Sequence, residues 1–469
     1  DSGGDMTSFL EDQKDKHMRT AKQEQQKMLD TLELFGEMYM TLSLFPLLLI
    51  IILVIMSMMS SGSKMDMMVG TVYGLIPLTG VGFLVLTSTV TQDSIGDGYL
   101  RPDRGDDRTY AEADAGFLNL GLVEGFTGTY GVFDRIKSRE GTYRATQILR
   151  RPHIFFRDNP LFVLGVTIPI TIAFLAVVVI FHMAPMTIAE LTVPQGAEVP
   201  ENLNTPDKRW TYPVIVGTFM WVYVPIYLNL LPLAVFYEWN LRTRRSVVGN
   251  LSENLRKLAS ANDTGMTLLE SIRVVADTSS GRMSDELETM HAKVNYGTSL
   301  KSALREFNNS YHIPRLARTV KLISEAQEAS SQIQDVLSTA AQASENQDDI
   351  DLERKSRTRM QMVIIIMTYL TLLGVMALLK VRFLTVMADL ATQTGGGGGS
   401  SSAVGGGSFS GVNTQMLSVL FFHAVVLQAL LSSFIAGYIR DVNLLSGVKF
   451  AVILPTVALV VWYAVTLLS

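Results

Sequence analysis

The chain has 469 residues, of which 48% are hydrophobic, and it carries a formal net charge of −5. Its mean hydropathy is positive, which is high for a soluble protein, and the modest negative charge argues against a nucleic-acid partner. Cysteine is absent, which excludes disulfides, thiolate metal sites and cysteine nucleophiles.

Long apolar runs recur along the whole chain. A helix needs about 20 mainly apolar residues to cross the hydrocarbon core of a bilayer. Runs that meet this requirement are Met38–Met59, Met67–Val90, Leu161–Ala184, Tyr212–Tyr237, Met362–Leu379, Met416–Ile439 and Lys449–Leu468. We therefore predict an all-α, polytopic membrane protein with about seven transmembrane helices in a lipid bilayer. A cytoplasmic helical-bundle domain is expected between spans four and five.

These runs divide the chain into eight predicted segments. In chain order they are a polar helix (1–37), a transmembrane hairpin (38–90), a cytoplasmic linker (91–160), a second transmembrane hairpin (161–237) with an outer loop (185–211), the helical domain (238–359), transmembrane helix five (360–384), a Gly/Ser-rich outer loop (385–413) and transmembrane helices six and seven (414–469).

Basic residues next to the spans predict the orientation. They cluster at Arg150, Arg151 and Arg157 before span three, at Arg242, Arg244 and Arg245 after span four, and at Arg354, Lys355, Arg357 and Arg359 before span five. These clusters all fall on one side of the predicted topology, and such clusters stay cytoplasmic. We expect a multi-pass protein of the cell membrane, with its N-terminus and large helical domains cytoplasmic and its C-terminus outside.

Helical periodicity is strong between the fourth and fifth spans. Leu251, Leu255 and Leu258 recur at i, i+4 and i+7, which is the spacing of one buried helix face. Gly265 and Gly297 are among the glycines that separate such stripes. The segment predicts a bundle of roughly five or six helices with a core of its own.

A search for chemistry finds no catalytic residue, no cofactor site and no metal site. The phosphate-binding motif G-x-x-x-x-G-K-[ST] and the nucleophile elbow are missing, and the histidines are scattered. The acidic run Asp348–Asp351 lacks the glycine and the terminal glutamate of a calcium loop, so it is interpreted as a solvated helix face. The sequence therefore predicts a protein that is not an enzyme.

Few polar side chains lie within the predicted spans. His423, Gln428 and Asn229 are the exceptions, and interhelical hydrogen bonding is favoured over a proton or ion relay for them. Lys380 and Arg382, at the end of span five, can snorkel to the interface. The spans thus resemble a scaffold, while a secondary transporter or channel-like protein remains the alternative.

A basic stripe in the helical domain is a candidate docking surface. Arg315, Arg318 and Lys321 follow one another at i, i+3 and i+6, which places them along one helix. A solvated face is the favoured explanation of such a stripe, and a docking surface for an acidic partner is the functional alternative. Three further cations are assigned to docking: Arg256, Lys257 and Arg440.

A pattern repeats at an offset of 327 residues. A polar helix leads into an apolar span from about Met38 and again from about Met362. Few identities survive, among them Leu10 with Leu337 and Thr31 with Thr358. Because the chain begins with Asp and in the middle of this pattern, we expect it to be a fragment or a processed form.

Three motifs in the helical domain carry a family resemblance. They are Leu255–Ile272, where an apolar helix meets a small turn and a second helix, Gly297–Leu300 followed by Ala303 and Leu304, and Glu328–Ile333 followed by Val336 and Leu337. In this order they resemble the type II secretion system F domain family, with Ser331 in a position where the family has glycine. Residues 1–6 resemble the tail of a first F-type module, so residues 1–37 are interpreted as the end of such a module.

The arrangement of modules and spans resembles the membrane platform proteins of archaeal type IV pili and the archaellum. The resemblance implies a non-catalytic platform that couples a hexameric secretion ATPase to the insertion of pilin-like filament subunits. It also implies a homo-oligomer, either a dimer or a trimer. The sequence does not distinguish pilus, archaellum and secretion system.

Overall fold

The computed structural model describes residues 6–59, 65–90, 100, 150–185, 213–328, 333–384 and 414–468. Within these ranges every regular element is a helix, and seven helices are long and apolar enough to cross a membrane. The predicted all-α fold with seven candidate spans is therefore confirmed. Most of the predicted linker, the outer loop from residue 186 and the Gly/Ser-rich tract lie outside the described residues.

The chain divides into two compact units. Unit 1 comprises Asp1–Gln92, Val163–Val235 and Leu352–Ser469, and unit 2 comprises Asp93–Phe162 and Phe236–Asp351. The elements of unit 1 are α1 (Met6–Met59), α2 (Met65–Gly70), the π-helical segment η1 (Thr71–Leu75), α3 (Ile76–Val90), α6 (Phe162–Ile180), α8 (Pro213–Thr218), the π-helical segment η3 (Phe219–Tyr223), the π-helical segment η4 (Lys380–Leu384), α17 (Thr414–Asp441), the 3-10 segment η5 (Leu444–Gly447) and α18 (Val448–Leu468). Helices α9 (Val224–Val248) and α15 (Ile333–Leu379) contribute to both units.

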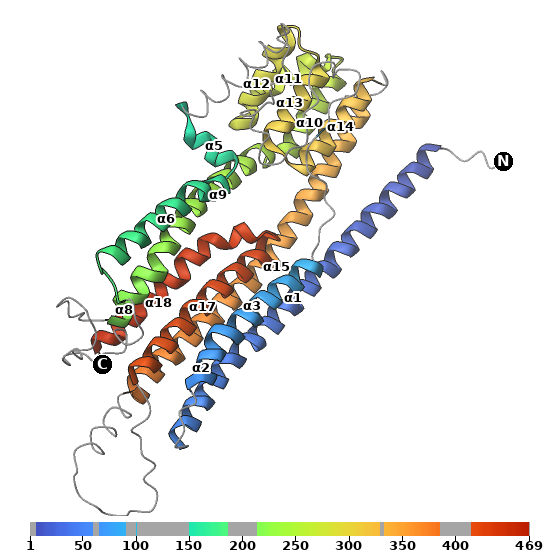
Figure 1. Ribbon diagram of the computed structural model, residues 1–469. Coiled ribbons are helices and arrows are strands. Elements are labelled where there is room, and N and C mark those ends of the chain that lie inside the picture. The colour runs from blue at the N-terminus through green and yellow to red at the C-terminus, as the bar shows by residue number, and fades with distance from the viewer. Residues whose placement is uncertain are drawn as a thin grey trace, which may run out of the picture. The chain divides into compact units, whose positions relative to one another are not determined.

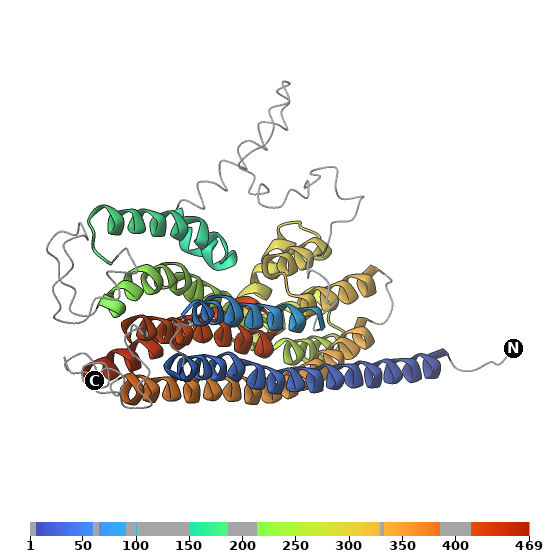
Figure 2. The ribbon, with the colours of Figure 1, turned by 60° about the horizontal axis from the view of Figure 1, so that its bottom comes forward.

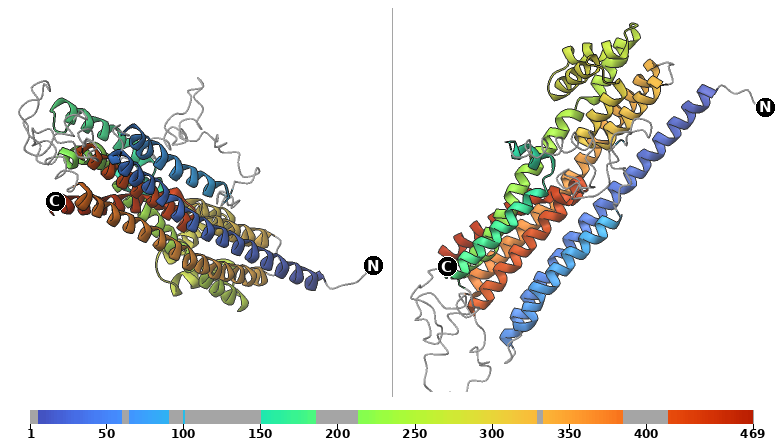
Figure 3. Two further views of the ribbon diagram at one scale, coloured as in Figure 1. Left: turned by 90° about the horizontal axis from the view of Figure 1, so that it is seen from below. Right: turned by 45° about the horizontal axis from the view of Figure 1, so that its top comes forward.

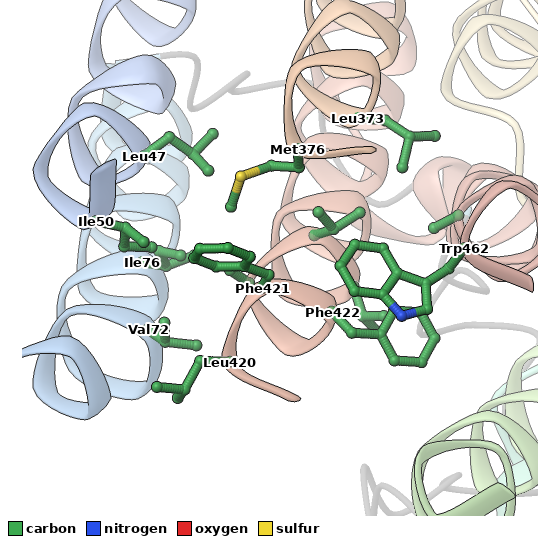
Figure 4. Close-up of a cluster of buried hydrophobic side chains, with 14 of the residues drawn as sticks. Leu47, Ile50, Val72, Ile76, Leu373, Met376, Leu420, Phe421, Phe422 and Trp462 are labelled. Carbon is green, nitrogen blue, oxygen red and sulfur yellow. The ribbon is translucent and has the colours of Figure 1, made fainter. Parts of the chain in front are cut away.

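Helix α17 forms the centre of unit 1. In its most apolar stretch 72% of the residues are buried, against at most 39% in any other candidate span of the described residues. Its residues Phe421 and Phe422 are completely buried, and the ring of Phe422 stacks on that of Trp462 from α18 at 5.1 Å. Figure 4 shows this core, to which α1, η1, α3, α15, α17 and α18 contribute. The other spans bury one face and leave apolar side chains such as Leu48 and Ile172 exposed, as expected for helices that face lipid.

Helices α1 and α15 run side by side within unit 1, and α1 also packs against α3 (Figures 2 and 3). The Nη1 atom of Arg357 in α15 donates to Oδ1 of Asp30 in α1 at 2.9 Å. The separation of these two residues along the chain is 327, the offset of the repeated pattern. At this pair, corresponding residues of the two copies are therefore in contact.

The hairpin of α17 and α18 needs two glycines. A Cβ atom on Gly437 would meet the backbone of Gly447, and a Cβ atom on Gly447 would meet the backbone around Phe434. Small residues at such positions allow two membrane helices to approach closely. Asn443 accepts a hydrogen bond from the backbone of Leu445 at 3.0 Å and so begins η5 in the turn.

Unit 2 is a helical bundle with its own core (Figure 1). Its elements are α5 (Pro152–Asp158), the end of α9, α10 (Leu251–Asp263), α11 (Leu268–Thr278), α12 (Arg282–Asn295), α13 (Leu300–Tyr311), α14 (Pro314–Glu328) and the beginning of α15. Leu251, Leu255 and Leu258 are all buried, which confirms the predicted stripe.

Local chemistry fixes the turns of the bundle. Thr267 accepts a hydrogen bond from the backbone of Glu270, whose carboxylate accepts one from Thr267 in return, which is the capping box that T-x-x-E predicts. Gly265, Gly281 and Gly297 all have positive φ, a conformation that glycine adopts without strain. His312 ends α13 in the left-handed region with φ of 51°, two residues before Pro314 begins α14.

Candidate functional site

Arg315 lies inside the bundle of unit 2 although it belongs to the predicted docking stripe. Its side chain is 13% exposed, and its Nη1 atom lies 2.6 Å from Oδ1 of Asp348 in α15. Its Nη2 atom donates to the backbone carbonyl of Ser344 at 2.6 Å and to the Ser344 hydroxyl at 2.5 Å. Because its charged end is bound within the bundle, Arg315 ties α14 to α15 and offers little charge to a partner.

Asp348 departs from the interpretation of the acidic run as a solvated face, whereas Asp349 is exposed as expected. Its side chain is 33% exposed, and Oδ2 accepts a hydrogen bond from the Ser252 hydroxyl at 2.8 Å. Asp348 therefore joins α10, α14 and α15. The sequence could not show this, because the two partners of Asp348 are far away in the chain.

Arg318 and Lys321 form the exposed part of the stripe. Both side chains are exposed, and Lys321 lies 3.8 Å from the Glu325 carboxylate within α14. Arg318 has no ion pair within the part of the chain that the structure describes. Exposed ion pairs at this spacing contribute only a few tenths of a kcal/mol to stability. Both cations can therefore bind a partner with little loss of stability.

The other predicted docking residues differ in their surroundings. Exposed Arg256 in α10 forms an ion pair with Glu345 of α15, and Lys257 lies 2.9 Å from Glu253 one turn earlier. Arg440 belongs to unit 1, at the end of α17, where its Nε atom lies 3.8 Å from Asp441. The structure thus groups Arg256, Lys257, Arg315, Arg318 and Lys321 in unit 2 and leaves Arg440 in the other unit.

Two titratable groups at the end of α13 are perturbed. Burial, together with a 2.6 Å hydrogen bond that the hydroxyl donates to Glu286, raises the pKa of Tyr311 to about 12. Burial, with the positive charge of Arg244, lowers the pKa of His312. Burial is the first cause of both shifts, so the shifts reflect packing at this end of the bundle.

The polar side chains within the spans bond to neighbouring helices. His423 of α17 contacts the Tyr73 hydroxyl in η1 through Nδ1 and the Thr218 hydroxyl at 3.1 Å through Nε2. Gln428 donates to the Tyr39 hydroxyl of α1 at 3.2 Å. The predicted interhelical hydrogen bonding is confirmed for both residues. Tyr73 lies in one π-helical segment and Thr218 immediately precedes another, so His423 joins two local irregularities, a feature that sequence periodicity does not reveal.

Asn229 also forms hydrogen bonds to a neighbouring helix. Its amide nitrogen donates to the Thr171 hydroxyl at 3.0 Å, and its carbonyl oxygen accepts from the Thr167 hydroxyl at 3.0 Å. Both threonines belong to α6, whereas Asn229 belongs to α9. The predicted interhelical bonding is confirmed here as well.

Lys380 corrects the expectation of snorkelling. Its side chain is buried, its Nζ atom lies 4.7 Å from the centre of the Trp462 ring, and it donates to the Thr466 hydroxyl. The ammonium group therefore packs against α18 within unit 1. A cation over an aromatic face is stabilised by the ring quadrupole, which a hydropathy pattern cannot show.

Comparison with protein families finds a match, which falls on the bundle and the span that follows it. Residues 255–379 match the family model of type II secretion system (T2SS) protein F. The match runs from α10 to the last residue of α15 and includes the fifth candidate span. It confirms the F-domain resemblance for this segment, which is less than half of the chain. No curated protein and no solved structure matches the chain.

Proposed function

We propose that this protein is a non-catalytic membrane platform of a type IV pilus-like or archaellum assembly machine. It couples a cytoplasmic hexameric secretion ATPase to the insertion of pilin-like subunits into a filament. The observation that carries this proposal is the F-domain match over α10–α15, in which α15 continues from the bundle core into a candidate span as one helix.

The proposed orientation follows from charge. Arg150, Arg151, Arg242 and Arg245 of unit 2 flank apolar spans and are exposed, and such clusters stay on the cytoplasmic side. Unit 2 is then cytoplasmic, where an ATPase can reach it. The C-terminus lies outside, and the platform acts as a dimer or trimer.

The proposed docking surface for the ATPase consists of Arg318 and Lys321 on α14. Arg256 and Lys257 lie on α10 of the same helical bundle and are assigned to this surface as well. The exposure of Arg318 and the weak pairing of Lys321 support this surface, since exposed cations attract an acidic partner. Arg315 has a positioning role, because it holds α14 against α15.

A secondary transporter is the alternative to this proposal. It would need polar groups that are available to a substrate or ion at mid-membrane. His423, Gln428 and Asn229 are bonded to neighbouring spans, so these three polar groups already stabilise the helix packing.

The test is filament assembly in cells that lack the gene. Complementation with the unaltered chain restores filaments, whereas the double variant Arg318→Glu/Lys321→Glu leaves pilin-like subunits in the membrane. Arg273→Glu is the matched control, since Arg273 is an exposed arginine of α11 in the same unit, and it restores filaments. Normal filaments in the deletion strain would contradict the platform function itself.

A further inference from the structure

Helix α5 lies next to α9 in Figure 1, and aromatic side chains of α5 pack on the end of α9 in unit 2. His153 of α5 stacks on Trp239 of α9 with ring centres 6.2 Å apart, and Phe156 lies 5.8 Å from Phe236. The Asn240 side chain, which is buried, donates to the backbone carbonyl of Arg157 at 2.8 Å. These contacts hold α5 in place, because a helix of 7 residues is too short to be stable alone.

This packing brings together two arginine clusters that are distant in the sequence. Arg150 and Arg151 directly precede α5, and Arg242 and Arg245 lie in the last turns of α9; all four side chains are exposed. Arg242 lies 3.5 Å from Glu238. Among the described residues, no ion pair is formed by Arg150, Arg151 or Arg245, so their charge is available to a ligand.

The surface formed by these arginines and rings lies next to the apolar runs of α6 and α9 along the chain. The apolar run of α9 ends at Tyr237, and five residues of helix place Arg242 about 7 Å further along the axis. The span candidate of α6 begins at Phe162, just after α5. The headgroup layer extends about 5 to 7 Å beyond the hydrocarbon on each side, so Arg242 falls at its outer edge, and Arg245 lies about 4.5 Å further out, within the reach of a long side chain. Arg150 and Arg151 precede α5, which packs against this end of α9.

The rings provide the apolar half of an interfacial anchor. Trp239 is 39% exposed, and the guanidinium of Arg157 lies 5.8 Å from its ring centre. Phe155 packs between Phe156 and Phe162 with ring centres 5.6 and 5.4 Å away. Aromatic rings next to a span can contact the acyl chains of a lipid, and neighbouring arginines can bind the phosphate of its headgroup.

We propose that this arginine–aromatic surface, formed by α5 and the end of α9, binds the phosphates of anionic phospholipid headgroups. The assignment is independent of the proposed platform function. Phospholipid is the occupant that the geometry favours, because the cations border apolar spans and an exposed tryptophan, and a soluble phosphate would use only the cations.

The experiment uses the full chain reconstituted in phosphatidylcholine vesicles that contain a minor share of brominated lipid. Bromine quenches tryptophan fluorescence on contact, and the contribution of Trp239 is the difference between the chain and its Trp239→Phe variant. Brominated phosphatidylglycerol is compared with brominated phosphatidylcholine. We expect stronger quenching by the anionic lipid, and a preference that falls up to fivefold for each arginine removed in Arg150→Gln/Arg151→Gln/Arg245→Gln.

Two further variants separate lipid binding from a loss of structure. Arg150→Lys/Arg151→Lys/Arg245→Lys keeps the preference, because the charges remain. Arg256→Gln/Arg318→Gln/Lys321→Gln removes the same number of cations elsewhere in unit 2 and changes nothing. Equal quenching by both lipids in the unaltered chain, or an unchanged preference in the glutamine variant, would overturn the proposal. Loss of the preference on adding soluble glycerol phosphate would overturn the assignment to phospholipid.

Discussion

Replacing Arg315 by Glu distinguishes a residue that holds the bundle together from one that meets a partner. The change removes the ion pair with Asp348 and both hydrogen bonds to Ser344, and it places two carboxylates side by side. Hydrogen bonds to charged groups contribute about 1.5 to 3 kcal/mol each. Arg315 is 13% and Asp348 33% exposed, so water can replace part of the lost hydrogen bonding. We therefore expect the free energy of unfolding to fall by at least about 2 kcal/mol.

The assay is amide hydrogen exchange of unit 2 in the full chain. A loss of about 2 kcal/mol raises the exchange rate of core amides in α14 and at the beginning of α15 by about thirtyfold. Arg318→Glu is the control, because Arg318 belongs to the same helix but is exposed, and its exchange rates stay within about twofold of the unaltered chain. Equal protection in the two variants would refute the inward role of Arg315.

Two further predictions concern the turns and the membrane hairpin. Gly437→Ala drives a methyl group into the Gly447 backbone and lowers the free energy of unfolding by about 1 to 3 kcal/mol. Gly82→Ala, whose added methyl group meets nothing, does not. Thermal unfolding in detergent, followed by tryptophan fluorescence, compares the two variants, and equal melting temperatures would argue against the close approach. The pKa of His312 is lower in the folded chain than its usual value of 6.5. Protonation of His312 therefore favours the unfolded chain, and the free energy of unfolding decreases as the pH falls below about 6.5. Asn tolerates positive φ, so His312→Asn should reduce the increase in local unfolding of α13 and α14 at low pH. Hydrogen exchange corrected for intrinsic rates measures this increase, and an identical pH response in the variant would show that His312 does not contribute.

Much of the architecture could be predicted because it depends on local signals. Apolar runs of sufficient length predict the seven candidate spans, and the spacing of leucines predicts helices in the bundle. Thr267 with Glu270 and the three glycines of positive φ mark turns that are visible as sequence patterns.

The contacts that join distant segments could not be predicted. Arg315 was expected on a surface because its spacing matches Arg318 and Lys321, yet Asp348 and Ser344 draw it into the bundle. Lys380 was expected at the interface, yet the Trp462 ring is close enough to hold it. In both cases a partner on another helix decides where a long side chain lies, and periodicity along a single helix carries no information about that partner.

The central claim is that the F-domain bundle connects a secretion ATPase to the membrane. Its most direct test is co-purification of the ATPase with the full chain from membranes, compared between the unaltered protein, Arg318→Glu/Lys321→Glu and Arg273→Glu. We expect the ATPase to be retained by the unaltered chain and by Arg273→Glu and to be lost from the double variant while unit 2 stays folded. Equal retention by all three would contradict the docking surface, and failure of the unaltered chain to retain the ATPase would contradict the claim itself.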